Sequence, residues 1–133
     1  MAASRDLVAS VYDAFNRGDV EVALDALADD VEWQTPDSLP WSEGAYRGRE
    51  GVARYFSAFA EALADGSVAP EVIEGNGDLV VARGFERATV RTTGTRFEAR
   101  FVHVWHLRDQ QVVAMEGVAD TASVRAAFET AIP

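Results

Sequence analysis

Residues 101–118 read FVHVWHLRDQQVVAMEGV, and the pattern of this stretch decides the expected fold. Residues 101–107 and 112–118 have the two-residue period of strands and flank a turn sequence at 108–111, as in an antiparallel hairpin. A loop of two or of four residues gives the same register, which places His103 opposite Glu116. The hairpin is therefore expected to hold a histidine beside a carboxylate on an apolar face.

The strand before this hairpin is expected to add a second carboxylate to the same face. Residues 79–92 alternate in the same way and turn at Thr93-Gly94. The simplest register puts Gly84 opposite His103 and places Glu86 on the apolar face as well. Because glycine has no side chain, this pairing predicts open space beside the histidine, where a ligand can approach.

The spacing of apolar residues predicts the remaining elements, and it changes from a helical to a strand period at Pro70. Expected helices cover Ser4–Gly18, Asp19–Ala28, Val52–Leu63 and Thr121–Thr130, and expected strands cover Val31–Thr35, Glu71–Glu74, Leu79–Thr92, Thr95–Leu107 and Val112–Val118. Residues 36–48 are expected to form a loop. Helices that precede antiparallel strands joined by short turns indicate one α+β domain over residues 1–133, in the order α-α-β-α-β-β-β-β-α.

The composition excludes several classes of chemistry and partner. With no cysteine and no lysine among 133 residues, the chain has no disulfide, no thiolate and no side-chain amine for a Schiff base. A formal net charge of −10 opposes binding to nucleic acid, and we expect no such partner. Adaptation to high salt and a codon bias toward arginine both account for an acidic chain without lysine.

The sequence predicts neither a secretory signal nor a membrane span. The first residues lack a charged start followed by an apolar run, and no stretch of about 18 apolar residues occurs. We therefore expect a cytoplasmic protein without a membrane partner.

One apolar face of the predicted sheet collects the candidate catalytic residues His103, Glu116 and Asp120. A histidine beside a carboxylate is the pair that tunes a general acid or base near neutral pH. The same pair is also explained by a purely structural role, because two buried polar groups satisfy each other's hydrogen bonds. Asp120 precedes Thr121-Ala122-Ser123, and it is at least as well explained as the N-cap of the last helix.

Aromatic residues and one further carboxylate are expected to shape a substrate cavity under the helices. They are Tyr12, Trp33, Trp41, Tyr46, Phe59, Glu86, Phe101 and Trp105. No metal site or cofactor is predicted, since His103 and His106 point to opposite faces of a strand and do not share an ion.

The other face of the predicted sheet is also apolar. It has Val102, Val104 and His106 across from Val113 and Met115. An antiparallel sheet with one face in water normally alternates apolar and polar residues. We therefore expect this outer face to be buried against a second copy of the chain in a homodimer.

Several segments together resemble the SnoaL-like branch of the nuclear-transport-factor-two-like superfamily. They are Phe15–Asp19, Leu27–Trp33, Tyr46–Val52, Phe101–Trp105 and Asp120–Ala122. The resemblance covers almost the whole chain, and it implies a cone, in which a curved antiparallel sheet wraps around helices and encloses a deep apolar cavity. It also implies dimers that form through the outer face of the sheet.

For activity, the resemblance implies several reactions and not one. The superfamily includes ketosteroid isomerases, polyketide cyclases, epoxide hydrolases, dehydratases and non-catalytic binding proteins, so the fold alone does not select a function. The ketosteroid isomerase residues are missing, because Val11, Thr35 and His103 stand where those enzymes carry a tyrosine and two aspartates. Asp120 matches the position of the acid–base aspartate of the polyketide cyclases.

The leading hypothesis is a small cofactor-independent enzyme that isomerises, cyclises or dehydrates an apolar carbonyl compound. Asp120 or Glu116 would remove a proton next to the carbonyl, and His103 would donate to the enolate oxygen. The alternative is a non-catalytic ligand-binding or structural dimer. A third hypothesis, epoxide opening by activated water, is ranked lower because Arg83 and Arg100 point away from the expected cavity.

Overall fold

The computed structural model describes residues 2–131 and contains four helices and six strands in this part of the chain. The elements are α1 (Ala2–Asn16), α2 (Val20–Asp25), β1 (Leu27–Gln34), β2 (Ala45–Arg47), α3 (Gly48–Ala62), β3 (Leu63–Asn76), β4 (Leu79–Val90), β5 (Arg96–Arg108), β6 (Gln111–Ala119) and α4 (Thr121–Glu129). The predicted α+β class is confirmed, with three differences in the elements. β1 begins at Leu27 and not at Val31, so it takes the last residues of the expected helix Asp19–Ala28. The short strand β2 lies inside the expected loop, and β3 begins at residue 63 instead of 71.

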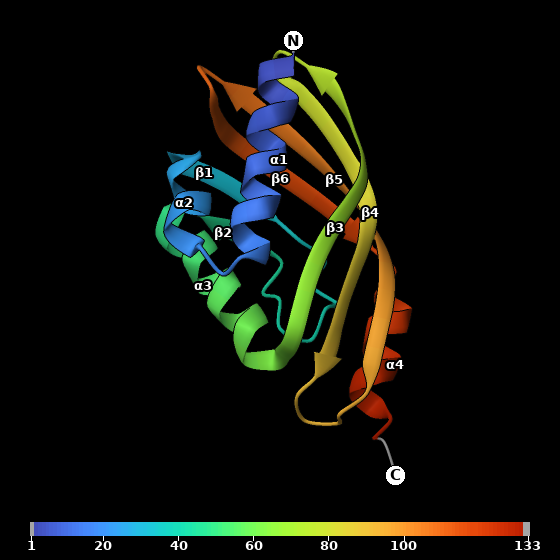
Figure 1. Ribbon diagram of the computed structural model, residues 1–133. Coiled ribbons are helices and arrows are strands. Elements are labelled where there is room, and N and C mark those ends of the chain that lie inside the picture. Colours follow the sequence, from blue (N-terminus) through green and yellow to red (C-terminus); the bar gives the residue numbers. More distant parts are fainter. Residues whose placement is uncertain (1, 132–133) are drawn as a thin grey trace.

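All six strands form one curved sheet in the order β2-β1-β6-β5-β4-β3 (Figure 1). Neighbouring strands are antiparallel except β1 and β6, which run parallel. The expectation of a purely antiparallel sheet is therefore wrong at this pair. The sequence does not reveal it, because β1 and β6 are far apart in the chain and no short turn fixes their relative direction.

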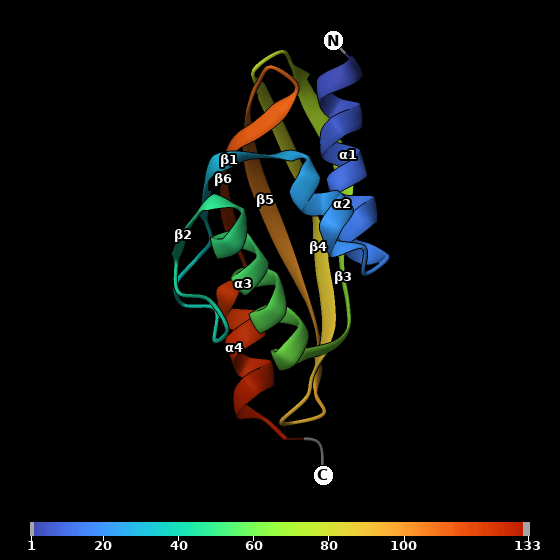
Figure 2. The same ribbon diagram turned by 90° about the vertical axis from the view of Figure 1, so that its left-hand side faces the viewer.

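Helices α1, α2 and α3 cover one face of this sheet (Figure 2). α1 packs mainly on β3, and α3 packs on β1 and β2. At the lower end α4 joins the core through Phe128, whose ring centroid lies 6.0 Å from that of Trp41. The core thus lies between the sheet and the helices. No helix within residues 2–131 is long and apolar enough to span a membrane.

A two-residue turn at Asp109–Gln110 joins β5 to β6, and its residues have positive φ angles of 52° and 60°. Positive φ at both positions is the geometry of a type I′ turn. The pairing begins as predicted, with Leu107 opposite Val112, but the register then shifts by one residue before His106. The shift is a β-bulge, in which Val113 is an extra residue of β6 without a partner on β5.

The bulge changes which residues of β6 face the core. His103 lies opposite Gly117, and Glu116 lies on the outer face, so the predicted pair of His103 with Glu116 is wrong. Glu116 instead contacts His106, with 2.9 Å between Oε1 and Nε2. Met115, which the sequence places on the outer face, is buried in the core. Each change follows from the same cause, because a slip of one residue turns a strand over.

The β4–β5 hairpin has the predicted faces but a register that differs by two residues. Gly84 lies opposite Phe101 instead of His103, because the turn occupies residues 91–95. A shift of two residues leaves each side chain on its expected face. Glu86 therefore points into the core as predicted.

Gly84 does not open space for a ligand, contrary to the expectation. A Cβ atom at this position would lie 2.0 Å from the Ala69 carbonyl oxygen and 2.7 Å from the Pro70 Cα. The backbone of β3, which has a register shift beside Pro70, fills this space. Glycine is required here because a second backbone approaches closely.

Asn16, the last residue of α1, fastens this helix to β3. Its Nδ2 donates to the Val68 carbonyl oxygen and its Oδ1 accepts from the Val68 N–H, both at 2.9 Å. The side chain thus pairs with Val68 as a neighbouring strand would. Val68 lies close to a register shift in the ladder between β3 and β4, so this clamp holds an irregular part of the sheet.

We expect Asn16→Ala to lower the free energy of unfolding by about 1–3 kcal/mol, because it removes the partner of two backbone groups at a buried residue. Chemical denaturation measures this change. Asp13→Ala, on an exposed position of the same helix, is the control and should change stability by less than about 0.5 kcal/mol. Equal effects of the two substitutions would contradict the role given to Asn16.

Candidate active site

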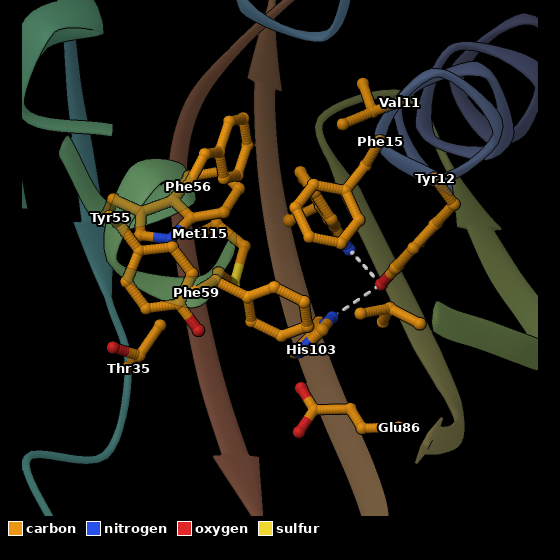
Figure 3. A pocket seen from close by; sticks show the side chains of 13 residues that line it. Val11, Tyr12, Phe15, Thr35, Tyr55, Phe56, Phe59, Glu86, His103 and Met115 are labelled. Carbon is orange, nitrogen blue, oxygen red and sulfur yellow. Dashed lines mark hydrogen bonds between the residues drawn. The ribbon is translucent and has the colours of Figure 1, made fainter. Parts of the chain in front are cut away.

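A cavity of about 50 Å³ lies between the core face of the sheet and helices α1 and α3. Aromatic side chains form most of its wall, and Figure 3 shows them around one small space. The lining residues are Val11, Tyr12, Phe15, Trp33, Thr35, Tyr55, Phe56, Phe59, Val68, Glu86, His103, Trp105 and Met115. The wall is therefore apolar apart from a few polar groups with distinct surroundings.

Three residues of the wall form a hydrogen-bonded chain. Trp105 Nε1–H donates to the Tyr12 hydroxyl oxygen at 3.1 Å, and that oxygen lies 2.6 Å from His103 Nδ1 (Figure 3). Because an indole N–H only donates, all three groups are satisfied when the Tyr12 hydroxyl donates to Nδ1. This assignment leaves the ring proton of His103 on Nε2.

His103 is held as a neutral ring and does not titrate near neutral pH. Burial lowers its pKa from 6.5 to about 3. The ring stacks on Phe101 with 4.2 Å between centroids, and its Cδ2 lies 3.0 Å from the point where a Cβ at Gly117 would be. Aromatic packing and a glycine thus fix the imidazole, in place of the carboxylate partner that the sequence predicts.

Glu86 is the acid of the cavity. Its side chain, on β4, is 5% exposed, and its Oε2 has no hydrogen-bond partner among the described residues. Burial raises the pKa of Glu86 from 4.5 to about 7, because an unpartnered carboxylate is costly in apolar surroundings. Among residues 2–131, no other Asp or Glu lines the cavity. Glu86 is therefore the wall residue that can exchange a proton near neutral pH.

The other hydroxyl groups of the wall are engaged by neighbours. Tyr55 accepts a hydrogen bond from Trp41 Nε1 at 3.3 Å, and the Thr35 hydroxyl bonds a nearby serine at 2.6 Å. Burial and the charge of Glu86 raise the pKa of Tyr55 above its ordinary value, and burial does the same for the pKa of Tyr12. Both phenols are therefore neutral groups that shape and polarise the cavity.

The structure brings six of the predicted site residues together at the cavity. They are Tyr12, Trp33, Phe59, Glu86, His103 and Trp105. Phe101 is buried beneath the imidazole of His103 and does not line the cavity. Trp41 and Tyr46 both contact Tyr55 and are likewise absent from the wall.

Two carboxylates that the sequence predicts as catalytic lie outside the cavity. Glu116 is on the outer face, as the β-bulge requires. Asp120 is exposed and caps α4, where its carboxylate accepts from the Ser123 N–H at 3.2 Å and from the Ser123 hydroxyl at 2.6 Å. These bonds hold the pKa of Asp120 below its ordinary value. The N-cap interpretation of Asp120 is the one that the structure supports.

Several wall residues are not predicted as site residues from the sequence. Tyr55 and Phe56 lie beside Phe59 on the apolar stripe of α3, but a helical stripe does not show which of its rings meet a cavity. Met115 is missed because no local signal marks the bulge that turns it inward. Thr35 continues the alternation of its strand, which is a usable signal for its inward direction.

The cavity lacks the groups for the third hypothesis, epoxide opening. Arg100 lies over the Phe85 ring with 5.0 Å to the centroid, and Arg83 is exposed. No arginine in the described part of the chain lines the cavity. Within residues 2–131, no cluster of three or more His, Asp or Glu side chains is placed to hold a metal ion.

A curved sheet wrapped around helices, with a buried acid in an apolar cavity, places the protein in the NTF2-like class, and solved structures agree. An NTF2-like protein of unknown function from Burkholderia pseudomallei is 31% identical, covers 92% of this chain and 94% of its own, and has a TM-score of 0.84. TerC, co-crystallised with polyporic acid, is 27% identical over 96% of this chain and 99% of its own, with a TM-score of 0.87. IdmH from Streptomyces antibioticus, a candidate polyketide cyclase, is 26% identical over 96% of this chain and 99% of its own, with a TM-score of 0.81.

The family model of the SnoaL-like domain matches residues 8–115. Because this match spans most of the chain, the protein belongs to the SnoaL-like family. The family resemblance read from the sequence is thereby confirmed. A comparison with curated proteins gives no match.

As the pH rises, we expect the free energy of unfolding of the wild type to decrease relative to that of Glu86→Gln. The folded protein keeps the Glu86 proton up to a pKa of about 7, whereas the unfolded chain releases it near 4.5. Between these values the unfolded state binds fewer protons, so stability decreases as the pH rises. From about pH 5.5 to about pH 8 the difference should grow by about 2 kcal/mol.

Denaturant titrations at several pH values, all above the isoelectric point of about 4.5, measure this difference. Glu61→Gln is the matched control for the loss of one carboxyl group, because Glu61 is exposed on α3. A difference between Glu86→Gln and the wild type that does not change with pH would show that the pKa of Glu86 is not raised.

Proposed function

We propose that the protein is a cofactor-independent enzyme that moves a proton within an apolar carbonyl compound, with Glu86 as its general base. The observation that carries this proposal is the buried, unpartnered carboxyl of Glu86 at an apolar cavity, with its pKa raised to about 7. A general base is most effective when its pKa lies near the working pH. Carboxyls perturbed in this way concentrate at functional sites.

The proposed first step is an enolisation. Ionised Glu86 takes a proton from the carbon next to the substrate carbonyl. The electron pair of that C–H bond forms the C=C bond of an enolate, and the π electrons of the C=O bond move onto oxygen. Return of the proton from Glu86 to another carbon of a conjugated enolate isomerises the substrate. Attack of the enolate carbon on a second carbonyl cyclises it, and Glu86 gives its proton to the new alkoxide. Loss of a neighbouring hydroxyl dehydrates it, when the enolate electrons re-form the C=O bond and Glu86 gives its proton to the departing hydroxyl, which leaves as water.

The neutral imidazole of His103 supports this role of Glu86. Glu86 and His103 line the same cavity, and the bond from Tyr12 holds the His103 ring in its wall (Figure 3). A charged imidazolium at this position would lower the pKa of the carboxyl and weaken the base. His103 is therefore proposed as a positioning residue whose neutrality keeps the pKa of Glu86 high.

The cavity wall favours a flat apolar ligand, because aromatic rings supply most of its surface. Similarity to TerC, which was crystallised with polyporic acid, supports a small organic molecule as the ligand. The cavity of about 50 Å³ is far below the roughly 300–1,000 Å³ of typical ligand pockets. Binding of a ring system therefore requires some of the aromatic side chains to change rotamer.

Deuterium exchange of a simple ketone tests the proposed enolisation. In D₂O the wild type should accelerate exchange at the α-carbon of cyclopentanone or β-tetralone, and Glu86→Gln should lose about a hundredfold of this rate or more. The kcat/KM for exchange should rise about tenfold per pH unit below about pH 7 and then level off. Proton NMR measures the loss of the α-hydrogen signal, and Glu61→Gln controls for the loss of one negative charge.

The non-catalytic alternative makes the opposite prediction. A binding protein would take up the ketones, seen as a shift of the Met115 methyl resonance in the cavity wall, and exchange would stay at the uncatalysed rate. Failure of both ketones to bind would contradict the proposed substrate class.

We further propose that the outer face of the sheet is the contact between two copies of the chain. Val118, Leu79 and Val102 are 62%, 48% and 37% exposed on this face. Glu116 and Arg83 lie on the same face and carry opposite charges, which a two-fold axis can pair between copies.

Light scattering tests the dimer through its mass. The wild type should have about twice the 14.4 kDa of one chain, and Val118→Arg should have the mass of a single chain, because it places an unpaired charge in the interface. Val22→Arg is the matched control, since Val22 is 45% exposed on α2, away from this face, and should leave the dimer intact. A single-chain mass for the wild type would contradict the proposal.

A further inference from the structure

The three tryptophan side chains of the core differ in their hydrogen bonds. Trp41 Nε1 donates to the Tyr55 hydroxyl at 3.3 Å, and Trp105 Nε1 donates to the Tyr12 hydroxyl at 3.1 Å. Trp33 is 5% exposed, yet its Nε1 has no partner among the described residues. Buried donors without an acceptor are rare in folded proteins, and each one calls for an explanation.

The surroundings of Trp33 show why no protein group satisfies it. The residue lies on β1 opposite Met115 of β6. Its ring packs against three aromatic rings, those of Tyr55, Phe56 and Trp105, with centroid distances of 6.3, 5.8 and 5.6 Å. The indole also lines the cavity that contains Glu86. A ligand in this cavity therefore contacts an indole whose N–H group has no partner among the described residues.

Trp33 Nε1 and Glu86 Oε2 are the two buried side-chain polar atoms without a partner in the described part of the chain. The indole only donates, and an ionised carboxylate only accepts. Enolisation needs this combination, because the base takes the proton while a donor stabilises the oxygen on which charge develops. We infer that Trp33 Nε1 donates a hydrogen bond to the substrate oxygen and is a catalytic residue of the proton transfer by Glu86.

This inference rests on the proposed function, and it narrows the substrate class. The ligand must carry a carbonyl or enolate oxygen that accepts from the indole as well as a hydrogen that Glu86 removes. A hydrogen bond to a charged acceptor is stronger than one to a neutral acceptor. The Trp33 contact therefore strengthens as the carbonyl becomes an enolate, which lowers the barrier more than it tightens binding of the ketone.

NMR of the indole groups tests the contact directly. The three tryptophans give three indole ¹H–¹⁵N signals. The signal of Trp33 is the one that disappears in Trp33→Phe. It is also the one that remains after Trp41→Phe and Trp105→Phe have identified the other two. β-Tetralone should move the Trp33 signal of the wild type downfield. Tetralin, which has the same ring system without the oxygen, should move it much less. The Met115 methyl signal shows for each ligand that the cavity is occupied.

Exchange kinetics test the catalytic role. Trp33→Phe should slow deuterium exchange of β-tetralone by about tenfold to a hundredfold, because it removes one donor to the developing charge. It should also weaken binding of the ketone more than binding of tetralin. Phe56→Leu alters the same wall without removing a donor, so it should weaken binding of both ligands equally.

The outcomes separate this inference from the proposed function. An occupied cavity with an unmoved Trp33 signal, together with exchange by Trp33→Phe within about twofold of the wild type, would overturn the role of Trp33 and leave that of Glu86 intact. A shifted Trp33 signal with no exchange by the wild type would overturn the proposed enolisation and leave Trp33 as a ligand-binding group.

Discussion

The β-bulge at Val113 is the feature on which the rest of the site depends. It follows a two-residue turn and shifts the ladder between β5 and β6 by one residue. Residues beyond it exchange faces, so Met115 enters the core and Glu116 leaves it. Without the shift, a carboxylate would lie beside His103, and the two groups would favour each other's charged forms. With it, the imidazole is neutral, and Glu86 is the one acid among residues 2–131 that lines the cavity.

That acid, Glu86, is placed where it costs stability. A carboxylate in an apolar cavity without partners destabilises the folded protein at neutral pH, as its raised pKa indicates. The surrounding fold tolerates this cost because aromatic packing and the clamp from Asn16 to Val68 stabilise the wall around it. Strained or unsatisfied groups that persist in this way are typical of functional sites.

The faces of β4 and β5 could be predicted from the sequence, but their register could not, and neither could the face of β6 beyond Val113. Glu86 and His103 reach the core as predicted even though the pairing of β4 with β5 differs by two residues, because parity alone decides the face. Glu116 is wrongly placed because a shift of a single residue reverses parity, and the segment around Val113 contains no glycine or proline to mark it. Alternation thus predicts a strand well and a bulge poorly.

The lack of hydrogen-bond partners for Glu86 and Trp33 also could not be predicted from the sequence. Residue types show that both groups can form hydrogen bonds, but only the packed core shows that no partner reaches them. The parallel pairing of β1 with β6 could not be predicted either, since it depends on how segments far apart in the chain come together. Trp33 lies in the part of β1 that pairs with β6, so this pairing determines which residues surround Trp33.

A ¹³C NMR titration of the Glu86 side-chain carboxyl tests most directly whether the cavity holds an acid that exchanges a proton near neutral pH. The resonance is identified by its loss in Glu86→Gln. A midpoint near pH 7 is the result expected from the buried and unpartnered position of this carboxyl. A midpoint near 4.5, the ordinary pKa of a glutamate, would contradict it and remove the basis for Glu86 as the general base.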